Sequence, residues 1–405
     1  MRFCVVALAL LAATRAHADE RRAVTLPDAI VAAQRAPAAQ IGVHDVAAAD
    51  ASVDAAGAWP SPLVHVATNR LTARLVAGAT IPLPLFGTVG AARRQARAEA
   101  DIVRADVELV QRELRHRAVV AWVALARADG DVVATSIAAQ QAAELELIAK
   151  GRVSAGVGAD VDVTVATAAR ARADVAAAAA QRAEDAASAS LAGVLGWDPL
   201  RPLRADGEPI AGDAVELDAL RARLARHPER AAALDRVAAA DATIETVQVQ
   251  HWPVLALEGE VSYDDQTLEP FGNHDARIGV AVELPLFARV GDKERAARAA
   301  AAAQRARLVV TETELGAGLV AAYRTWQAAS ERLRALEHDV APAQERAAAL
   351  SAQAYREGAR DLASALQAQR DLAAVRAEIN SARADAAVAF ADLQLAAGLE
   401  VGGGK

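Results

Sequence analysis

The side chains best suited to metal binding or catalysis in this chain are its eight histidines and its one cysteine. Seven histidines follow the first twenty residues: His44, His65, His116, His227, His251, His274 and His338. No two of them have the spacing that places a pair of metal ligands on one helix face, and the sequence contains neither a nucleophile elbow nor a phosphate-binding glycine loop. We therefore expect no enzymatic activity, no bound metal and no cofactor.

Arginine, aspartate and tyrosine side chains gather beside two glycines, Gly156 and Gly358, which lie 202 residues apart. The segments 152–162 and 355–361 surround them. Glycine commonly ends a helix because it adopts a left-handed backbone conformation without strain. The alternative without a functional role is that the nearby charges are solvated groups at helix ends. The pattern predicts two turns between helices, with polar side chains available for contacts.

A secretory signal peptide is predicted at the N-terminus. The basic start at Met1 and Arg2 is followed by an apolar run over 3–13 and by small residues at Ala16 and Ala18, so cleavage is expected after Ala18. The apolar run is too short for a membrane anchor, and Cys4 lies too early for lipoprotein acylation. Cleavage would leave a chain without cysteine, which excludes disulfides and thiolate metal sites.

The composition favours long helices over an enzyme core filled by large side chains. Among the 405 residues, 54% are hydrophobic but only 3% are aromatic, and alanine is the commonest residue. Alanine is the best helix former and allows helices to pack closely. A net charge of −8 argues against a nucleic-acid-binding surface. After the N-terminus, no apolar run reaches the roughly 20 residues of a membrane-spanning helix.

Short motifs recur in order at a nearly constant offset, which indicates an internal duplication. Trp59-Pro60 returns as Trp252-Pro253, and Pro84-Leu85-Phe86 returns as Pro285-Leu286-Phe287, 201 residues on. The join lies in the proline- and glycine-rich stretch 197–212, which has the composition of a linker. We expect a signal peptide at 1–18, a first repeat at 19–208 and a second repeat at 209–405.

Each half carries the same predicted elements in the same order. A helical segment is followed by two short strands, a very long helix, a glycine-marked turn and a final helix. The predicted helical ranges are 26–58, 90–150 and 160–194 in the first half, and 217–250, 291–355 and 361–396 in the second. Pro342 is expected to kink or break the second long helix. About 60 helical residues span roughly 90 Å, which predicts a coiled-coil or barrel-like assembly.

The predicted strands alternate between apolar and polar residues. In the second half, alternation runs through 255–263 and 278–284, with acidic side chains on the polar face. In the first half, 60–69 and 74–86 are weaker candidates. Such alternation is typical of transmembrane β-strands, although a soluble hairpin packed on the helices would also produce it. Four strands cannot close a barrel, and open edges are not tolerated in lipid, so the membrane interpretation requires several chains.

These features resemble the TolC-type outer-membrane factor family over nearly the whole mature chain. The resemblance rests on the signal peptide, the twofold repeat, the Pro-Leu-Pro-Leu-Phe-Gly stretch at 82–87 and the two turns at 152–162 and 355–361. The compact length and the short first hairpin loop are similar to the heavy-metal (cation) efflux branch. The fold expected is mainly α with a small β part.

What the resemblance implies is a homotrimer in which four strands per chain close a barrel in outer-membrane lipid and the helices continue it as a tunnel across the periplasm. The implied function is a passive exit duct of a tripartite efflux system. An inner-membrane pump of the resistance-nodulation-division type would supply energy, and a periplasmic adaptor would join pump to duct. No nucleic acid is involved.

The resemblance also assigns roles to the turns. In the family, a tyrosine and an arginine near the second turn contact an aspartate near the first and close the tunnel; the matching residues are Tyr355, Arg360 and Asp162. The exposed small residues of the turns are expected to meet the adaptor. The best candidates are Arg152, Ser154, Gly156 and Gly358.

One departure concerns the aperture. The family's best-known member carries rings of aspartates on the helix after the second turn, and these bind cations. At the matching positions this chain has Ser364 and Gln367, with Asp160 and Asp361 nearby. We expect these four residues to line the aperture without forming a strong cation-binding ring.

Two other functions fit the sequence. One is a duct for type I protein secretion, because a passive duct carries whatever its pump delivers. The other is a soluble periplasmic coiled-coil scaffold or adaptor, which would explain the helices and the export signal but not the acidic–apolar alternation of 255–263 and 278–284. The transported substrate does not follow from the sequence.

Overall fold

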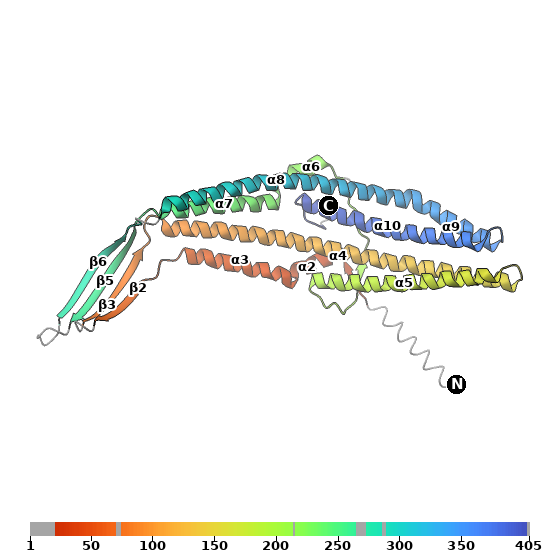
Figure 1. Cartoon of the computed structure of the whole chain (residues 1–405), viewed down its shortest axis with the longest axis horizontal. Helices are drawn as coiled ribbons and strands as arrows, with labels where there is room; N and C mark the ends of the chain where they lie inside the picture. The colour runs from red at the N-terminus through yellow and green to blue at the C-terminus, as the bar shows by residue number, and fades with distance from the viewer. Residues whose placement is uncertain (1–20, 70–73, 214, 265–272, 286–288, 403–405) are drawn as a thin grey trace, which may run out of the picture. The chain divides into compact units, whose positions relative to one another are not determined.

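The computed structural model describes residues 21–69, 74–213, 215–264, 273–285 and 289–402. The predicted signal peptide, Phe287 and most of the loops between paired strands lie outside these residues. The chain divides into two compact units, one built from residues 1–40, 110–225 and 315–405 and the other from 41–109 and 226–314. Each unit draws segments from both halves of the sequence, and two of the four boundaries fall inside the long helices α4 (Thr88–Ser154) and α8 (Val290–Ala335) (Figure 1).

The second unit holds a four-stranded antiparallel sheet in the order β2-β3-β5-β6. Its strands are β2 (Leu63–Asn69), β3 (Arg74–Leu83), β5 (Val254–Asp264) and β6 (Asn273–Glu283). The four predicted strands are therefore present, with ends shifted by up to five residues. Pairing of β3 with β5 joins the hairpin of the first half to that of the second.

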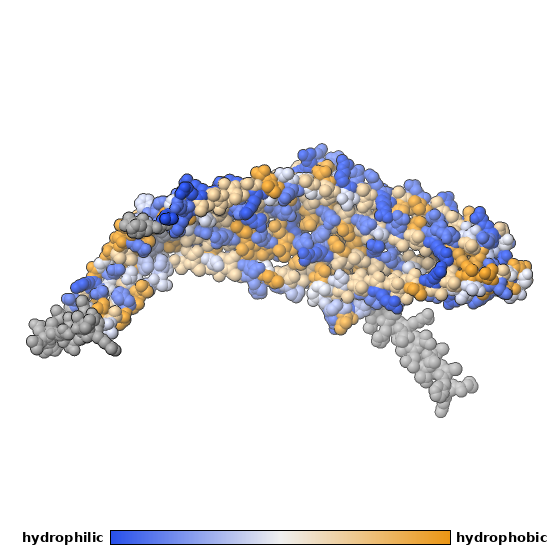
Figure 2. All heavy atoms as spheres, in the orientation of Figure 1, coloured by the Kyte–Doolittle hydropathy of each residue, from blue (hydrophilic) through white to orange (hydrophobic). Residues whose placement is uncertain are grey.

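Register places the apolar residues of neighbouring strands on one face of the sheet. Ala79 of β3 pairs with Gly259 of β5, and Gly259 pairs with Ile278 of β6. Since side chains alternate between faces, most of the large apolar side chains of the four strands fall on this face, whereas Leu63, Val76 and Val254 fall on the other. Ile278 is 86% exposed and Val280 is 63% exposed, so no described part of the chain covers this face there. Figure 2 shows exposed hydrophobic side chains over the strands, interspersed with hydrophilic ones. The other large apolar members of this face are Val64, Val66, Leu75, Ile81, Leu255, Leu257, Val261 and Val282.

The opposite face of the sheet carries its charged side chains. Glu258 and Glu260 of β5 lie there, with Arg277 and Glu283 of β6, and Glu260 pairs directly with Arg277. At the end of the sheet the Phe86 ring stacks on Trp252, with centroids 5.1 Å apart and an interplanar angle of 10°. These two aromatics lie at strand ends. Among the helices that the structure describes, none has the length and apolarity needed to span a membrane.

Helices of the second unit are joined mostly by ion pairs. They are α3 (Pro37–Ala56), the first part of α4 (Thr88–Ser154), α7 (Pro228–Val249) and the first part of α8 (Val290–Ala335). Asp241 on α7 pairs with Arg305 on α8 at 2.6 Å, and Glu312 on α8 pairs with Arg230 on α7 at 2.7 Å. These pairs are partly solvent-exposed, so each contributes only about 0–1 kcal/mol. Their main effect is to set which helix faces meet.

The first predicted helical segment of each half is in fact divided. Pro37 and Pro228 each begin a new helix, so α2 (Leu26–Arg35) precedes α3, and α6 (Leu217–Arg223) precedes α7. Proline is favoured at the first position of a helix because its missing N–H would be unpaired there. Thr25 caps α2 by accepting a hydrogen bond from the Asp28 N–H at 3.3 Å. The helical segments expected at 26–58 and 217–250 are therefore present, each divided into two helices at a proline.

Pro342 interrupts the second long helix, as expected. α8 ends at Ala335, a π-helical turn spans Leu336–Val340, and α9 (Ala341–Arg356) follows. A π turn is a common way to accommodate a residue that cannot donate a backbone hydrogen bond. α10 (Leu362–Ala396) packs against α9, and α5 (Asp160–Leu195) follows α4 in the corresponding place (Figure 1).

A small parallel sheet of the first unit was not predicted. β1 (Arg22–Thr25) pairs with β4 (Leu203–Asp206), which lies inside the stretch expected to be a plain linker. Leu203 is 2% exposed, and the Arg22 guanidinium lies 4.1 Å from the centre of the Trp197 ring. The stretch between the halves is thus part of the folded core as well as a connection.

Two tryptophans anchor the cores of the first unit. The Trp122 indole donates a hydrogen bond to the Val24 carbonyl at 2.7 Å, and the Trp326 indole donates to the Ala211 carbonyl at 2.7 Å. Both are almost fully buried. Their indole N–H groups are satisfied by the segments that precede the first helix of each half, so each tryptophan ties such a segment to a long helix.

One buried and one half-buried carboxyl beside β4 predict an unusual dependence of stability on pH. Glu184 is 7% exposed and pairs with Arg21 at 2.6 Å, and Asp129 accepts the Ala205 N–H at 2.8 Å. Burial raises the pKa of both carboxyls. Because the folded state holds protons that the unfolded state has lost, stability should rise as the pH falls through the raised pKa values toward the ordinary ones.

The expected result is that Asp129→Asn raises the melting temperature at neutral pH and reduces its dependence on pH. The asparagine keeps an oxygen that can accept the Ala205 N–H but removes a desolvated charge. Asp206→Asn, an exposed change on β4, is the control. A fall in melting temperature for Asp129→Asn at every pH would contradict the assignment.

Candidate functional site at the two helix turns

The two glycine turns of the first unit have the same backbone geometry. Gly156 follows α4 with φ of 76°, and Gly358 follows α9 with φ of 79°. After each glycine the next N–H bonds back to the third residue from the helix end: Val157 to the Arg152 carbonyl and Ala359 to the Ala354 carbonyl, at 2.9 and 2.8 Å. This is the Schellman motif. Both turns are therefore rigid and expose their tips.

Arg152 joins the two turns. Its Nη1 donates to the Tyr355 carbonyl at 3.0 Å, and its guanidinium lies 5.2 Å from the centre of the Tyr355 ring. A Cβ added to Gly358 would lie 3.2 Å from the same Nη1, so glycine at that position leaves room for the guanidinium. Arg152 was predicted to contact the adaptor, but its guanidinium already makes these two contacts with Tyr355 of the same chain.

Tyr355 is the buried centre of the junction. It is 2% exposed and packs with Leu145, Ala149, Leu362 and further small residues of α4, α5 and α10. Its hydroxyl is buried without a hydrogen-bond partner among the described residues. Burial raises the pKa of the phenol, and the negative charge of Asp162 adds to this effect. Asp162 is therefore near Tyr355, but the two are not hydrogen-bonded.

Arg360 is not part of this junction. Its side chain is exposed, and within the described part of the chain its guanidinium makes no hydrogen bond or ion pair. The positive charge near Tyr355 comes from Arg152 instead, because the left-handed turn at Gly358 directs the residues after it into solvent. Of the three predicted gating residues, the structure brings Tyr355 and Asp162 together and leaves Arg360 apart.

The predicted aperture residues are mostly engaged in helix capping. Asp361 caps α10 by accepting the Ser364 N–H at 3.2 Å, and its carboxylate also accepts the Ser364 hydroxyl. These two hydrogen bonds lower the pKa of Asp361, and the bond from the Ser364 hydroxyl has the larger effect. Gln367 donates to the Asp371 carboxylate at 2.8 Å. Asp160 is exposed in the first turn of α5, where its negative charge favours the helix N-terminus.

The remaining candidates for adaptor contact lie on the outer surface of the turns. Ser154, Gly156 and Gly358 are all exposed. The Ser154 hydroxyl donates to the Gly151 carbonyl at 2.8 Å, which leaves its oxygen able to accept. The structure therefore presents these three residues together with the exposed Val157 at the end of the helices.

A polar cluster between α4 and α5 supports the junction. Glu146 is 4% exposed. Its carboxylate accepts hydrogen bonds from Lys150 at 2.6 Å, Arg170 at 3.0 Å and Thr167 at 3.0 Å. These three bonds, led by Lys150, lower the pKa of Glu146 from 4.5 to about 2. Sequence reasoning missed this cluster, although the four-residue spacing of Glu146 and Lys150 was a usable signal.

Because the pKa of Glu146 is lowered on folding, its contribution to stability is complete above the unfolded value and is lost as the pH falls toward about 2. Glu146→Gln should therefore lower the melting temperature at pH 7 but have a much smaller effect near pH 2. Thermal unfolding across that range measures the difference. Glu144→Gln, an exposed neighbour on α4, is the control; equal effects of the two variants would refute the prediction.

Known sequences support a specific family. The sequence profile described as outer membrane efflux protein matches residues 31–197 and 219–399. A comparison with curated proteins found no match.

Several solved structures share the fold. The outer membrane protein VceC from Vibrio cholerae is 20% identical, with a TM-score of 0.76 over 93% of this chain and 96% of that one. CusC is 16% identical, with a TM-score of 0.79 over 92% of each chain. The CmeC outer membrane channel of Campylobacter jejuni is 14% identical, with a TM-score of 0.74 over 94% of this chain and 87% of that one.

Proposed function

The chain belongs to the outer membrane efflux protein family and is an outer-membrane efflux channel of the TolC type, and on that premise we propose that it works as the passive exit duct of a tripartite system. The single observation that carries the proposal is the sheet of the second unit: one face is mainly apolar and exposed in the described part of the chain, while the other carries the charged side chains, including Glu258, Glu260 and Glu283. A lipid-facing surface and a water-facing surface are what a membrane duct requires.

We propose that three copies of the chain form the duct, since channels of the TolC family are trimers. Among the described residues, the outer edges of β2 and β6 in the four-stranded sheet have no strand partner. Strands of three chains would close these edges and satisfy their backbone groups in lipid. The N-terminal segment 1–18 would serve as a cleaved export signal, and the repeats 19–208 and 209–405 would derive from a duplication.

The periplasmic end of the duct is proposed to lie at the two helix turns. Asp162, Tyr355 and Arg360 are proposed to hold the resting channel closed, with Arg152 added because it bridges the turns. Arg360, exposed in the single chain, is free to reach a neighbouring chain of the trimer. Asp160, Asp361, Ser364 and Gln367 would line the aperture.

A periplasmic adaptor is proposed to bind the exposed turn residues Ser154, Gly156 and Gly358, with Arg152 at the edge of the contact. An inner-membrane pump of the resistance-nodulation-division type would deliver the substrate. The compact length supports a place in the heavy-metal (cation) efflux branch. Deletion of the gene should then lower resistance to metal ions more than resistance to drugs.

Cell fractionation tests the proposed location. The protein should be recovered from the outer membrane only with detergent, and it should migrate as a trimer after mild extraction. Recovery from the periplasm without detergent would contradict the proposed duct and favour a soluble scaffold. A secretion defect without any change in metal or drug resistance would point to a type I protein-secretion duct.

A further inference from the structure

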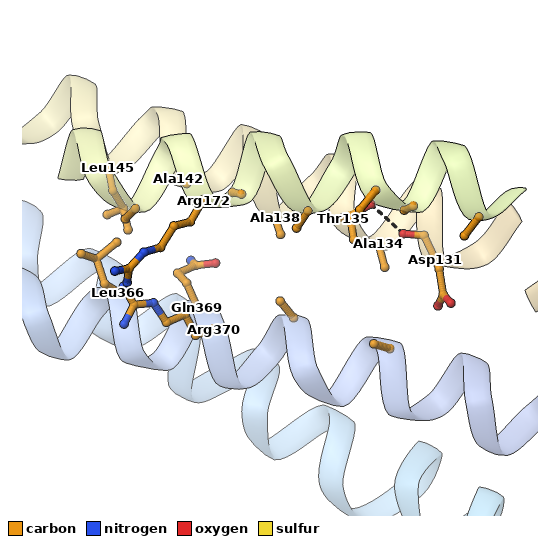
Figure 3. A pocket seen from close by; sticks show the side chains of 18 residues that line it. Asp131, Ala134, Thr135, Ala138, Ala142, Leu145, Arg172, Leu366, Gln369 and Arg370 are labelled. Atoms are coloured by element: carbon orange, nitrogen blue, oxygen red, sulfur yellow. Dashed lines mark hydrogen bonds between the residues drawn. The ribbon is translucent and has the colours of Figure 1, made fainter. Parts of the chain in front are cut away.

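A groove of about 580 Å³ runs between α4, α5 and α10 in the first unit (Figure 3). Its volume lies within the 300–1,000 Å³ typical of small-molecule sites. Alanines from all three helices form most of its wall, including Ala138, Ala142, Ala173, Ala176, Ala373 and Ala377. The groove is therefore a narrow apolar trough with room for an extended aliphatic chain.

Two arginines meet at one end of the trough. Arg172 of α5 and Arg370 of α10 both line it, and Figure 3 shows their side chains reaching toward each other from the two helices. Within the described part of the chain, neither guanidinium has a hydrogen bond or an ion pair. Both side chains are exposed, so water screens their mutual repulsion, and an anion bound between them would pair with both guanidinium groups.

The neighbouring carboxylates already have other partners. Asp174 pairs with Arg170 at 3.7 Å, and Asp371 accepts from Gln367 at 2.8 Å. At the far end of the trough, Asp131 accepts from Asn380 at 3.1 Å. Among the described residues, no carboxylate is therefore paired with Arg172 or Arg370.

A third polar group lies beside the two arginines. Gln369 of α10 lines the trough, and its side-chain oxygen is buried without a hydrogen-bond partner among the described residues. A buried acceptor without a donor costs about 1–3 kcal/mol. A ligand that satisfies all three groups carries an anionic head, an N–H donor next to it and an apolar tail.

We propose that this groove binds an amphiphilic anion of the N-acyl amino acid class. The carboxylate lies between the Arg172 and Arg370 guanidinium groups, the amide N–H donates to the Gln369 side-chain oxygen, and the acyl chain follows the alanines. The bound molecule bridges α5 and α10 next to the junction at Tyr355. The site lies within one chain and does not depend on what the duct exports.

Calorimetric titration of N-octanoylglycine into the full-length channel in lipid nanodiscs, with empty nanodiscs subtracted, tests the site. Saturable binding is expected, and Arg172→Gln and Arg370→Gln should each weaken it about tenfold. Arg182→Gln, on α5 outside the groove, is the matched control. Ala373→Leu should abolish binding by filling the trough.

Analogues of the ligand test the same contacts as the protein variants do. N-octanoylsarcosine has no amide N–H and should bind more weakly than N-octanoylglycine, and Gln369→Ala should remove that difference. Octyltrimethylammonium, with the opposite charge, should not bind. No saturable binding, or equal affinity of the wild type and both arginine variants, overturns the proposal while leaving channel conductance, and hence the duct, unaffected.

Discussion

Replacement of Tyr355 by alanine is expected to raise the conductance of the resting channel in a planar bilayer, whereas replacement by phenylalanine is expected to leave it unchanged. The Tyr355 ring fills the space between the two helix turns and is 2% exposed. Truncation of a buried aromatic ring to alanine costs about 3–5 kcal/mol. A loss of that size would separate the turns that close the tunnel.

The phenylalanine variant separates packing from hydrogen bonding. The Tyr355 hydroxyl has no partner within the described chain, so its removal deletes no bond there. If Tyr355→Phe opened the channel as much as Tyr355→Ala, the hydroxyl would have to act through a contact with another chain of the trimer.

Arg152→Ala should raise the conductance more than Arg360→Ala in the same measurement if the contact within one chain dominates. Arg152 both stacks on the Tyr355 ring and bonds its carbonyl, while Arg360 is exposed. The reverse order would show that closure depends mainly on contacts between chains. Unchanged conductance in all four variants would remove the gating role from this site.

Val280→Arg on β6 should destabilise the assembled channel by roughly 2–4 kcal/mol if that residue faces the middle of the membrane. The Val280 side chain is 63% exposed and lies on the apolar face of the sheet. Placing a charge against lipid is costly, whereas placing it against water is not. The denaturation midpoint in lipid vesicles, at fixed protein concentration, measures the loss.

Ala281→Arg is the matched control, since the adjacent residue points to the polar face with Glu258 and Glu260. It should leave the midpoint nearly unchanged. Equal small losses for both variants would indicate that the sheet lies in water on both sides, as the soluble scaffold alternative requires.

Most helices, strands and turns of this protein could be predicted from local sequence. Alternation over β5 and β6 gave two faces of opposite character, and the register of the sheet places those faces as the alternation predicts. Gly156 and Gly358 marked the turns because a positive φ is strained for other residues. The divided helices at Pro37 and Pro228 were missed, because apolar periodicity continues across a proline that begins a new helix.

Pairing across long sequence distances was decided by tertiary structure. Arg152 and Tyr355 lie 203 residues apart, and nothing local distinguishes Arg152 from Arg360 as the partner of that ring. The β1–β4 sheet escaped prediction for the same reason, since each strand has four residues and gains its stability from the other. Local propensity and periodicity thus determine the helices, strands and turns, while the contacts that position a charge depend on which helices pack together.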